Sequence, residues 1–311
     1  MQLRLVRVKS KVGFHILLIV LTFLTLTFKE GVWALLFAYN ENKEILTKIF
    51  WSEYPYAISL LIILFCHEMG HYIPARFYQL KTTLPYFIPM PASPVGTMGA
   101  VIQIQEPIQD KIKLFDIGVG GPVASLVLSV ICWLIGLHYS NLADLAEFAN
   151  QKNILNFGDS LFTYYTGQWI LGPYDPITTT ILIHPLAKAG WVGLLITAIN
   201  LIPFGQLDGG HIVYSLFGEK YRRWIYYLFF GFIFLGFINF TWVIWGFIIY
   251  FFIKVEHPYV PDAEAELGLG RRTLGYFMLA SLLFIFVPVP ISAGNETTLF
   301  QDIINYIQGR H

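Results

Sequence analysis

Residues 61–74 read LIILFCHEMGHYIP, an apolar run that contains two histidines and a glutamate. The segment 54–78 around this run is long and apolar enough to enter a lipid bilayer as a helix. Polar side chains of this kind at the centre of a bilayer cost roughly 2–3 kcal/mol or more each. Because ionisable residues in membrane helices are rare and usually functional, His67, Glu68 and His71 mark a candidate site.

The spacing of the two histidines indicates a metal. His67 and His71 stand four residues apart, so on a helix they share one face. Two imidazoles at that spacing can bind one ion, and Glu68 beside them can take a proton from metal-bound water, as in the H-E-x-x-H helix of zinc hydrolases. Pro74 is expected to end or kink the helix just beyond. The alternative is a chance match, with both histidines hydrogen-bonded inside a helix bundle.

The composition indicates a multi-span membrane protein. Of the 311 residues, 56% are hydrophobic and 13% are charged, and the mean hydropathy is +0.59. Soluble domains usually carry about 25% charged residues. The formal net charge is zero and no Lys/Arg cluster is present, which argues against a nucleic-acid partner. Two cysteines, Cys66 and Cys132, both in apolar runs, exclude a disulfide framework.

The apolar segments predict an all-α polytopic fold with about seven transmembrane helices, and six to eight are compatible with the pattern. The expected spans are roughly 13–28, 54–78, 115–138, 178–202, 224–238, 240–253 and 273–290. The segment 224–253 is either two short helices broken near Ile238 and Asn239 or one long tilted helix. The first span is expected to be retained, because Lys29 and Glu30 follow it without a small-residue cleavage site.

Basic residues in the short loops predict the orientation. They share one face of the membrane if the spans alternate and 224–253 counts as two spans: Arg4, Arg7, Lys9, Lys11, Arg76, Lys81, Lys111, Lys113, Arg222, Arg223, Arg271 and Arg272. The opposite loop, 139–177, is mainly acidic. We therefore expect a cytoplasmic membrane protein with its N-terminus in the cytoplasm, its C-terminus outside and the histidine pair nearer the cytoplasmic side.

A catalytic zinc needs a third protein ligand. The best candidate lies in NLIPFGQLDGGH (200–211), where Asp208 sits in a helix break rich in Pro and Gly. Non-helical backbone at membrane depth is tolerated only where protein buries it or a wet cavity lies beside it. Asp208 has two alternative readings, an Asp-Gly turn or the N-cap of a short helix 211–217. His211 is a competing ligand that ranks below Asp208.

Asn200 is the next polar residue upstream of the break. Its side-chain amide could stabilise a developing oxyanion on a substrate carbonyl. The alternative for Asn200 is a hydrogen bond between helices with no part in chemistry.

The segment between the second and third spans predicts a strand. LPYFIPMPASPVGTMGAVIQIQ (84–105) is rich in Pro and Gly at first and then alternates apolar and polar residues. Gly96 and Gly99 indicate a tight turn or a close backbone approach. An exposed strand edge here could pair with an extended peptide, or the segment could be a surface hairpin without a substrate role.

Three stretches in this order resemble the site-2 protease family of intramembrane zinc metalloproteases. His67-Glu68-Met69-Gly70-His71 is similar to the HExxH of the family. Gly96-Thr97-Met98-Gly99-Ala100 resembles its glycine-containing loop, and Asn200-Leu201-Ile202-Pro203 with Asp208-Gly209 resembles its N-x-x-P…D-G motif. The chain looks most similar to the compact bacterial branch without a PDZ or CBS domain, which is related to the plastid members.

The resemblance implies a site and a reaction. One Zn²⁺ per chain would be bound by His67, His71 and Asp208, with Glu68 as general base and Asn200 stabilising the intermediate. The strand-like loop, Gly96, Thr97, Met98, Gly99 and Ala100, would bind unwound substrate. The partners would be a transmembrane protein substrate and the lipid bilayer, and the sequence sets no oligomeric state.

We expect three parts in the chain: an N-terminal span and amphipathic connector at 1–53, a catalytic membrane core at 54–218, and C-terminal spans with a polar connector at 219–311. Two other functions stay open. A metal-ion transporter would spread ionisable residues along a pathway, often with internal symmetry, whereas this chain concentrates them at one depth. A catalytically inactive membrane scaffold is the other alternative, against which the intact Glu68 argues.

Overall fold

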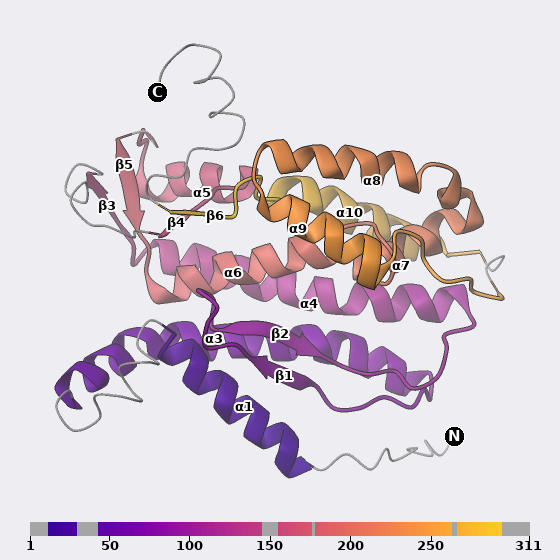
Figure 1. Ribbon diagram of the computed structural model, residues 1–311, viewed down its shortest axis with the longest axis horizontal. Helices are drawn as coiled ribbons and strands as arrows, with labels where there is room; N and C mark the ends of the chain where they lie inside the picture. The colour runs from indigo at the N-terminus through magenta and orange to yellow at the C-terminus, as the bar shows by residue number, and fades with distance from the viewer. Residues whose placement is uncertain (1–11, 30–42, 145–154, 176–177, 263–265, 294–311) are drawn as a thin grey trace. The chain divides into compact units, whose positions relative to one another are not determined.

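The computed structural model describes residues 12–29, 43–144, 155–175, 178–262 and 266–293. These residues are mostly helical and also form three two-stranded sheets (Figure 1). Arg4, Arg7, Lys9 and Lys11, on which the predicted orientation partly rests, lie outside the described residues.

The chain divides into two compact units, which we describe in turn. The first unit comprises Met1–Gln109, Asp116–Asn141 and Ile183–Thr197, and the second comprises Asp110–Phe115, Leu142–Leu182 and Ala198–His311. Two helices, α4 (Lys111–Leu137) and α6 (Pro185–Asn200), contribute most of their length to the first unit.

The first unit also contains α1 (Val12–Thr27) and α3 (Lys43–Phe77), which carries the H-E-x-x-H segment. Helix α3 begins well before the expected residue 54 and continues past Pro74 to Phe77, so of the two effects expected of Pro74, an end or a kink, the end is wrong. A proline removes one hydrogen bond from a helix, but a helix packed on neighbouring elements tolerates that loss.

Glycine brings the helices of this unit into backbone contact. A Cβ atom at Gly120 of α4 would lie 2.1 Å from the carbonyl oxygen of Gly70 in α3. A Cβ atom at Gly190 of α6 would lie 2.4 Å from the amide nitrogen of Trp133 in α4. Small residues allow such close approach between apolar helices, where backbone packing replaces the hydrophobic effect. The core of the unit therefore lies between α3, α4 and α6.

A β-hairpin completes the first unit and confirms the predicted strand. Strands β1 (Tyr86–Pro89) and β2 (Thr97–Val101) are antiparallel, with Phe87 opposite Ala100. Strand β2 begins earlier and ends earlier than the alternation AVIQIQ suggests, and beyond it only Ile104 pairs, through an isolated bridge to Thr82. Helix α1 packs on β1 and on α3 (Figure 1).

The second unit is built from short helices and strand pairs. Its elements are β3 (Asn141–Asp144), β4 (Leu155–Phe157), α5 (Leu161–Leu171), β5 (Thr179–Leu182), α7 (Asp208–Phe217), η2 (Gly218–Arg223), α8 (Ile225–Ile233), η3 (Phe234–Phe237), α9 (Thr241–Ile248), the π-helical turn η4 (Ile249–Ile253), α10 (Leu269–Ile285) and β6 (Ile291–Ala293). The helix is interrupted between Phe237 and Thr241, so the alternative of two short helices in 224–253 is correct.

The all-α prediction missed two of the three strand pairs. β3 pairs with β5, and β4 pairs antiparallel with β6, with Asn156 opposite Ser292. The segment 139–177, expected only as an acidic loop, holds α5 and strand residues. These strands have three or four residues, too few for a period of two to stand out in a sequence.

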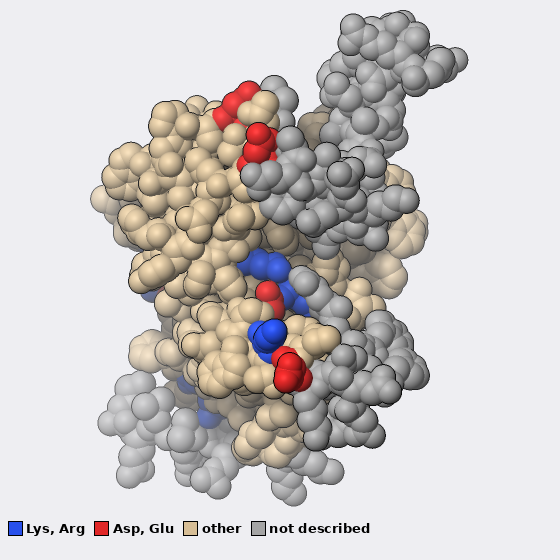
Figure 2. All heavy atoms as spheres, turned by 90° about the vertical axis from the view of Figure 1, so that its left-hand side faces the viewer, with Lys and Arg blue, Asp and Glu red and all other residues tan. Residues whose placement is uncertain are grey.

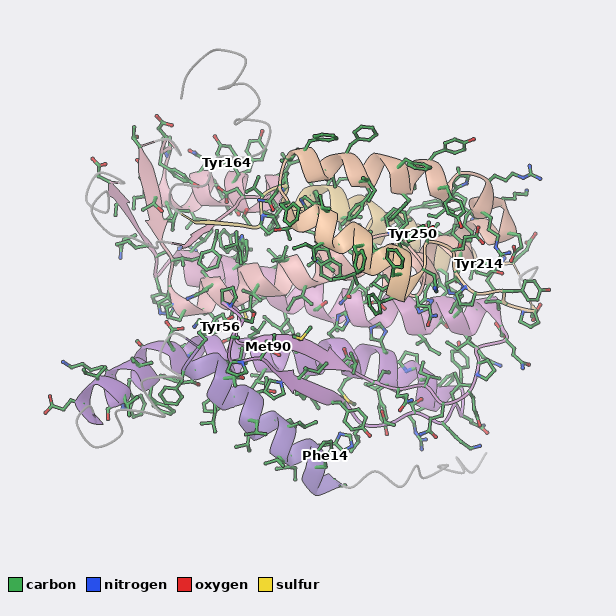
Figure 3. The ribbon with its side chains drawn as sticks, in the orientation of Figure 1. Phe14, Tyr56, Met90, Tyr164, Tyr214 and Tyr250 are labelled. Atoms are coloured by element: carbon green, nitrogen blue, oxygen red, sulfur yellow. The ribbon has the colours of Figure 1, made fainter. Side chains whose placement is uncertain are left out.

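Two helices of the described residues are long and apolar enough to cross a membrane by length and composition: Glu44–Phe77 and Lys111–Leu137. Shorter apolar helices are Val12–Thr27, Ile225–Phe237 and Thr241–Ile253. Figure 2 shows one face of the molecule, on which Lys, Arg, Asp and Glu are few. Exposed aromatic side chains, Phe14 and Tyr250 among them (Figure 3), are common on these helices, as they are on surfaces that face lipid.

Candidate metal centre

Helix α3 presents His67 and His71 on one face, as their spacing predicts. Both side chains are buried, with 4% and 8% of their surface exposed, and their Nε2 atoms lie 3.2 Å apart. Tetrahedral zinc with Zn–N bonds of 2.0–2.1 Å places two nitrogens about 3.3 Å apart. The two imidazoles therefore already stand at the separation that one zinc ion requires.

The backbone of α4 fixes the orientation of His71. Its Nδ1 lies 2.7 Å from the carbonyl oxygen of Ile117. A carbonyl oxygen can only accept, so Nδ1 carries the proton and the lone pair is at Nε2. Gly121 lies against the same ring, because a Cβ atom there would come within 2.1 Å of Nε2. His71 is thus held in the tautomer and the position of a metal ligand.

The other histidine is held by a hydroxyl group. His67 Nδ1 lies 3.0 Å from Ser125 Oγ, one turn beyond Gly121 on α4. Thr197 of α6 donates a hydrogen bond of 2.8 Å to the same oxygen. Neither Ser125 nor Thr197 was assigned to the site from the sequence. Their signal is weak, because small polar residues in apolar helices also serve packing alone.

Asp208 is the first residue of α7, after the break 201–207 that follows α6. Glycine is required in this turn: Gly205 has φ +51°, and a Cβ atom at Gly209 would lie 2.0 Å from the carbonyl oxygen of Leu201. The N-cap alternative for Asp208 is wrong, because α7 begins at Asp208 itself and its N-cap is Leu207. A carboxylate in the first turn of a helix is stabilised by the helix dipole.

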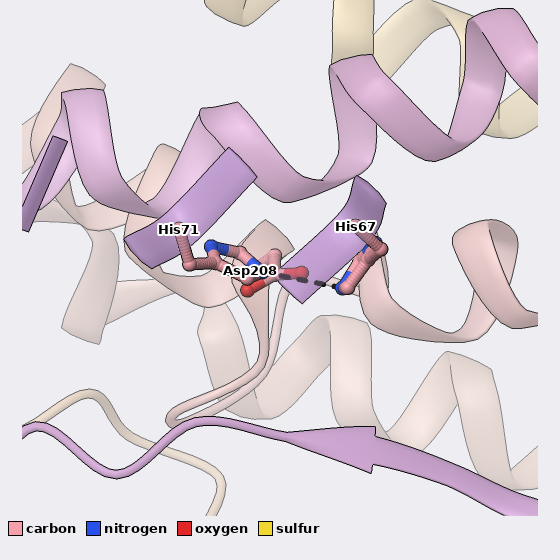
Figure 4. A group of neighbouring side chains, drawn as sticks. All are labelled: His67, His71 and Asp208. Atoms are coloured by element: carbon pink, nitrogen blue, oxygen red, sulfur yellow. Dashed lines mark hydrogen bonds between the residues drawn. The ribbon is translucent and has the colours of Figure 1, made fainter. Parts of the chain in front are cut away.

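His67, His71 and Asp208 form a group whose possible ligand atoms all lie within 4.8 Å of one another (Figure 4). It is the only group of three or more such residues that could hold a metal within the described part of the chain. Two imidazole nitrogens and one carboxylate oxygen are a usual donor set for catalytic zinc, which keeps its fourth position for water. The residues present therefore fit a zinc ion.

Two further predicted residues are Glu68, on the same helix as the two histidines, and Asn200, on α6. Glu68 is buried on α3, with 6% of its surface exposed, and directly follows His67. Asn200 is the last residue of α6 and is partly exposed. The competing ligand His211 instead pairs with His257, whose Nε2 lies 2.7 Å from His211 Nδ1.

The predicted substrate loop coincides with β2 and the turn before it. Gly96 and Gly99 both have positive φ, +91° and +100°. A Cβ atom at Gly96 would meet the backbone of Thr25 in α1 at 2.7 Å, whereas one at Gly99 would meet nothing within 4 Å. Thr97 is buried and its hydroxyl donates to the carbonyl oxygen of Ile88, while Met98 is 68% exposed. The turn is therefore fixed to α1 at Gly96, whereas Gly99 is buried in β2 with no atom within 4 Å of the place where a Cβ would lie.

A family model described as Peptidase family M50 matches residues 55–237, more than half of the chain, and the match contains His67, His71 and Asp208. The chain belongs to Peptidase family M50. This confirms the predicted family, which was recognised from the three motifs.

Curated relatives include plastid proteins. The chain is 37% identical over 166 residues to "Probable zinc metalloprotease EGY1, chloroplastic" of Arabidopsis thaliana, covering 53% of this chain and 30% of that protein. It is 28% identical over 248 residues to "Probable zinc metalloprotease EGY2, chloroplastic" of the same plant, covering 79% of this chain and 44% of that protein. The chain thus spans less than half of the length of these relatives.

Proposed function

We propose that this chain is an intramembrane zinc metallopeptidase that hydrolyses peptide bonds within or near transmembrane segments of other membrane proteins. The observation that carries the proposal is the group of His67, His71 and Asp208, a zinc donor set whose two histidines lie on a long apolar helix. Membership of Peptidase family M50 and the names of the plastid relatives support the same activity.

His67, His71 and Asp208 would hold one zinc ion per chain. When bound, zinc supplies a Lewis acid that polarises the scissile carbonyl and makes water acidic enough to attack near neutral pH. The buried carboxylate of Glu68 would accept the proton of the attacking water and pass it to the leaving peptide nitrogen. The side-chain amide of Asn200 would donate a hydrogen bond to the carbonyl oxygen as negative charge develops there.

The hairpin is proposed to hold the substrate in an extended form. A helical peptide bond is shielded by its own hydrogen bonds, so the substrate must unwind locally before it reacts. Strand β2 offers backbone groups for pairing with an extended chain, and Met98 in this strand is exposed. Gly96, Thr97, Met98, Gly99 and Ala100 would therefore be the substrate-binding residues.

The membrane arrangement is also part of the proposal. We propose seven spans in the cytoplasmic membrane, with the N-terminus in the cytoplasm and the site nearer that side, on the basis of the basic loops. The two long apolar helices and the shorter ones support insertion in a bilayer. The division into parts 1–53, 54–218 and 219–311 follows from this arrangement.

The test compares wild type with Glu68→Gln, using the zinc content of the purified protein and the cleavage of a membrane-embedded reporter. We expect the variant to keep its zinc and to lose cleavage, because the amide cannot accept the proton. Glu44→Gln is the matched control, since Glu44 is exposed in the first turn of the same helix. Equal cleavage by wild type and Glu68→Gln would refute the proposed protease, and a folded wild type with substoichiometric metal would favour the scaffold.

A further inference from the structure

We propose that Ser125 and Thr197 are positioning residues that hold His67 in the tautomer that binds the metal. The inference rests on the proposed zinc site and adds two residues to it that lie outside the three motifs. All the contacts that carry it lie within the first unit of the chain.

The two hydroxyl groups are buried and form a series of hydrogen bonds that ends at His67 Nδ1. Ser125 and Thr197 are 1% and 0% exposed. Thr197 Oγ1 lies 2.8 Å from Ser125 Oγ, which lies 3.0 Å from His67 Nδ1. In an apolar helix bundle these contacts meet no competition from water, so each proton has few possible acceptors.

The acceptors around Ser125 assign its proton in the metal-binding arrangement. A metal at His67 Nε2 requires the proton at Nδ1, and Nδ1 then donates to Ser125 Oγ. The Ser125 hydroxyl can give its own proton to a carbonyl oxygen of α4, Gly121 at 3.2 Å or Pro122 at 3.3 Å. The Ser125 oxygen then accepts from His67 and from Thr197, so the polar hydrogens of His67 Nδ1, Ser125 and Thr197 each have an acceptor.

The same hydroxyl also permits the opposite tautomer. If Ser125 donates to His67 Nδ1, the imidazole proton moves to Nε2, which faces His71 Nε2 at 3.2 Å. That arrangement joins the two histidines to each other, and because the lone pair of His71 Nε2 accepts this hydrogen bond, neither Nε2 atom offers a lone pair to a metal. Ile117 permits no such exchange at His71, because its carbonyl oxygen only accepts. His67 is thus the ligand whose tautomer depends on its partner, and Ser125 sets it.

The role of Thr197 is to orient Ser125. Thr197 lies on α6, and its single hydroxyl proton has two acceptors, Ser125 Oγ at 2.8 Å and the carbonyl oxygen of Gly193 in the preceding turn at 2.7 Å. A proton donated by Thr197 fills one lone pair of Ser125 Oγ and favours the rotamer in which Ser125 donates to its own helix. The geometry therefore connects α6 to a metal ligand on α3 through one residue of α4.

Helix α4 supplies a matched control. Ser129 lies one turn beyond Ser125, is fully buried, and its hydroxyl has no hydrogen-bond partner among the described residues. Ser129→Ala removes the same atom from the same helix without touching His67. Thr197 offers a second pair, because Thr197→Val removes the hydroxyl at nearly constant volume and Thr197→Ser keeps it.

The experiment measures Zn²⁺ affinity of the full chain in detergent, by competition with a chromophoric chelator, with thermal unfolding of each variant as a folding check. Loss of a group that orients a metal ligand typically lowers metal affinity 10–100-fold. We expect a loss of that size for Ser125→Ala, a smaller loss for Thr197→Val, and affinity near wild type for Thr197→Ser and Ser129→Ala. If Ser125→Ala does not fold, the two Thr197 variants decide the question.

Unchanged affinity in a folded Ser125→Ala, or an equal loss in Ser129→Ala, would overturn the inference. If Thr197→Ser binds Zn²⁺ as weakly as Thr197→Val, Thr197 acts through packing and not through its hydroxyl group, and its positioning role is overturned. These outcomes are separate from the proposed activity: a wild type that binds zinc with these dependences and yet cleaves no reporter would contradict the protease alone, whereas a folded wild type without zinc would contradict both.

Discussion

His71 shows how closely the backbone of α4 surrounds one candidate ligand. Its Nδ1 donates to the carbonyl oxygen of Ile117, and Gly121 leaves space for the ring one turn later. Ile117, Gly121 and Ser125 follow one another at intervals of four residues, so one face of α4 lies behind both imidazoles. The glycine is required because any side chain at position 121 would occupy the place of the ring.

Gly121→Ala is therefore expected to lower zinc affinity at least 10-fold. The added methyl group would lie 2.1 Å from His71 Nε2 and would displace the imidazole. Overpacking of this kind typically costs about 1–3 kcal/mol of stability as well. Chelator competition and thermal unfolding measure both effects. Gly231→Ala in α8, where a Cβ atom would meet nothing within 4 Å, is the control, and equal zinc affinity of Gly121→Ala and wild type would contradict the argument.

At the scale of elements, hydrogen bonds connect the residues that follow η4, His257 to Val260, to α7 and η2. His257 Nδ1 donates to the carbonyl oxygen of Pro258, so its Nε2 is left to accept from His211 Nδ1 in α7. The hydroxyl of Tyr214, labelled in Figure 3, accepts from the amide of Val260 at 3.1 Å. These contacts hold the helix that Asp208 begins, and they lie in a segment that the sequence indicated only as a polar connector.

The burial of His257 in these contacts predicts that the stability of the protein depends on pH. Burial, with a smaller effect of Arg222, lowers the pKa of His257 to about 4, although the carbonyl of Pro258 and the charge of Glu219 act in the opposite direction. The unfolded chain takes up this proton near pH 6.5, whereas the folded chain resists it until about pH 4. The stability from neutral His257 is therefore present above pH 6.5 and is lost as the pH falls towards 4.

Thermal unfolding between pH 7.5 and pH 4 in detergent checks this expectation. His257→Gln should be less stable than wild type at neutral pH and should lose less stability on acidification. The variant leaves unchanged the residues around His257, which are His211, Tyr214, Tyr221, Glu219 and Arg222. His138→Gln, at an exposed histidine, should follow wild type. Parallel curves for wild type and His257→Gln would show that His257 does not cause the dependence.

At the scale of the whole molecule, apolar composition and basic loops argue for a polytopic arrangement. Two described helices can cross a bilayer by length and composition, and the remaining apolar helices are shorter. Short helices are compatible with a bilayer where they are tilted, broken or enclosed by neighbours. The broken pair α8–η3 and α9–η4 is of this kind.

The seven-span proposal predicts which loops a membrane-impermeant maleimide can reach in intact cells. Tyr165→Cys, in the segment expected outside, should be labelled directly. Lys81→Cys and Lys220→Cys, in segments expected in the cytoplasm, should be labelled only after permeabilisation. All three positions are exposed in the structure. The unmodified chain is the control for Cys66 and Cys132, and labelling of Lys81→Cys and Tyr165→Cys from the same side would contradict the seven spans.

Local patterns in the sequence were enough to predict several features. The i, i+4 spacing of His67 and His71 places both on one helix face, because a helix has a fixed period. The Pro and Gly residues of 201–210 predict the break before α7, since they act on the backbone within a few residues. The strand after Gly96 was predicted from the alternation of apolar and polar residues, and the break in 224–253 was one of two alternatives that the sequence left open.

Only the tertiary structure decided which side chains form hydrogen bonds with the histidines. Ser125 is 58 residues from His67, and Thr197 is 72 residues from Ser125, so no local period connects them. A serine or threonine in an apolar helix has the same pattern whether it packs, as Ser129 does, or holds a ligand, as Ser125 does. The physical reason is that hydrogen bonding depends on which helix faces meet, and in this chain glycine contacts between α3, α4 and α6 determine that meeting.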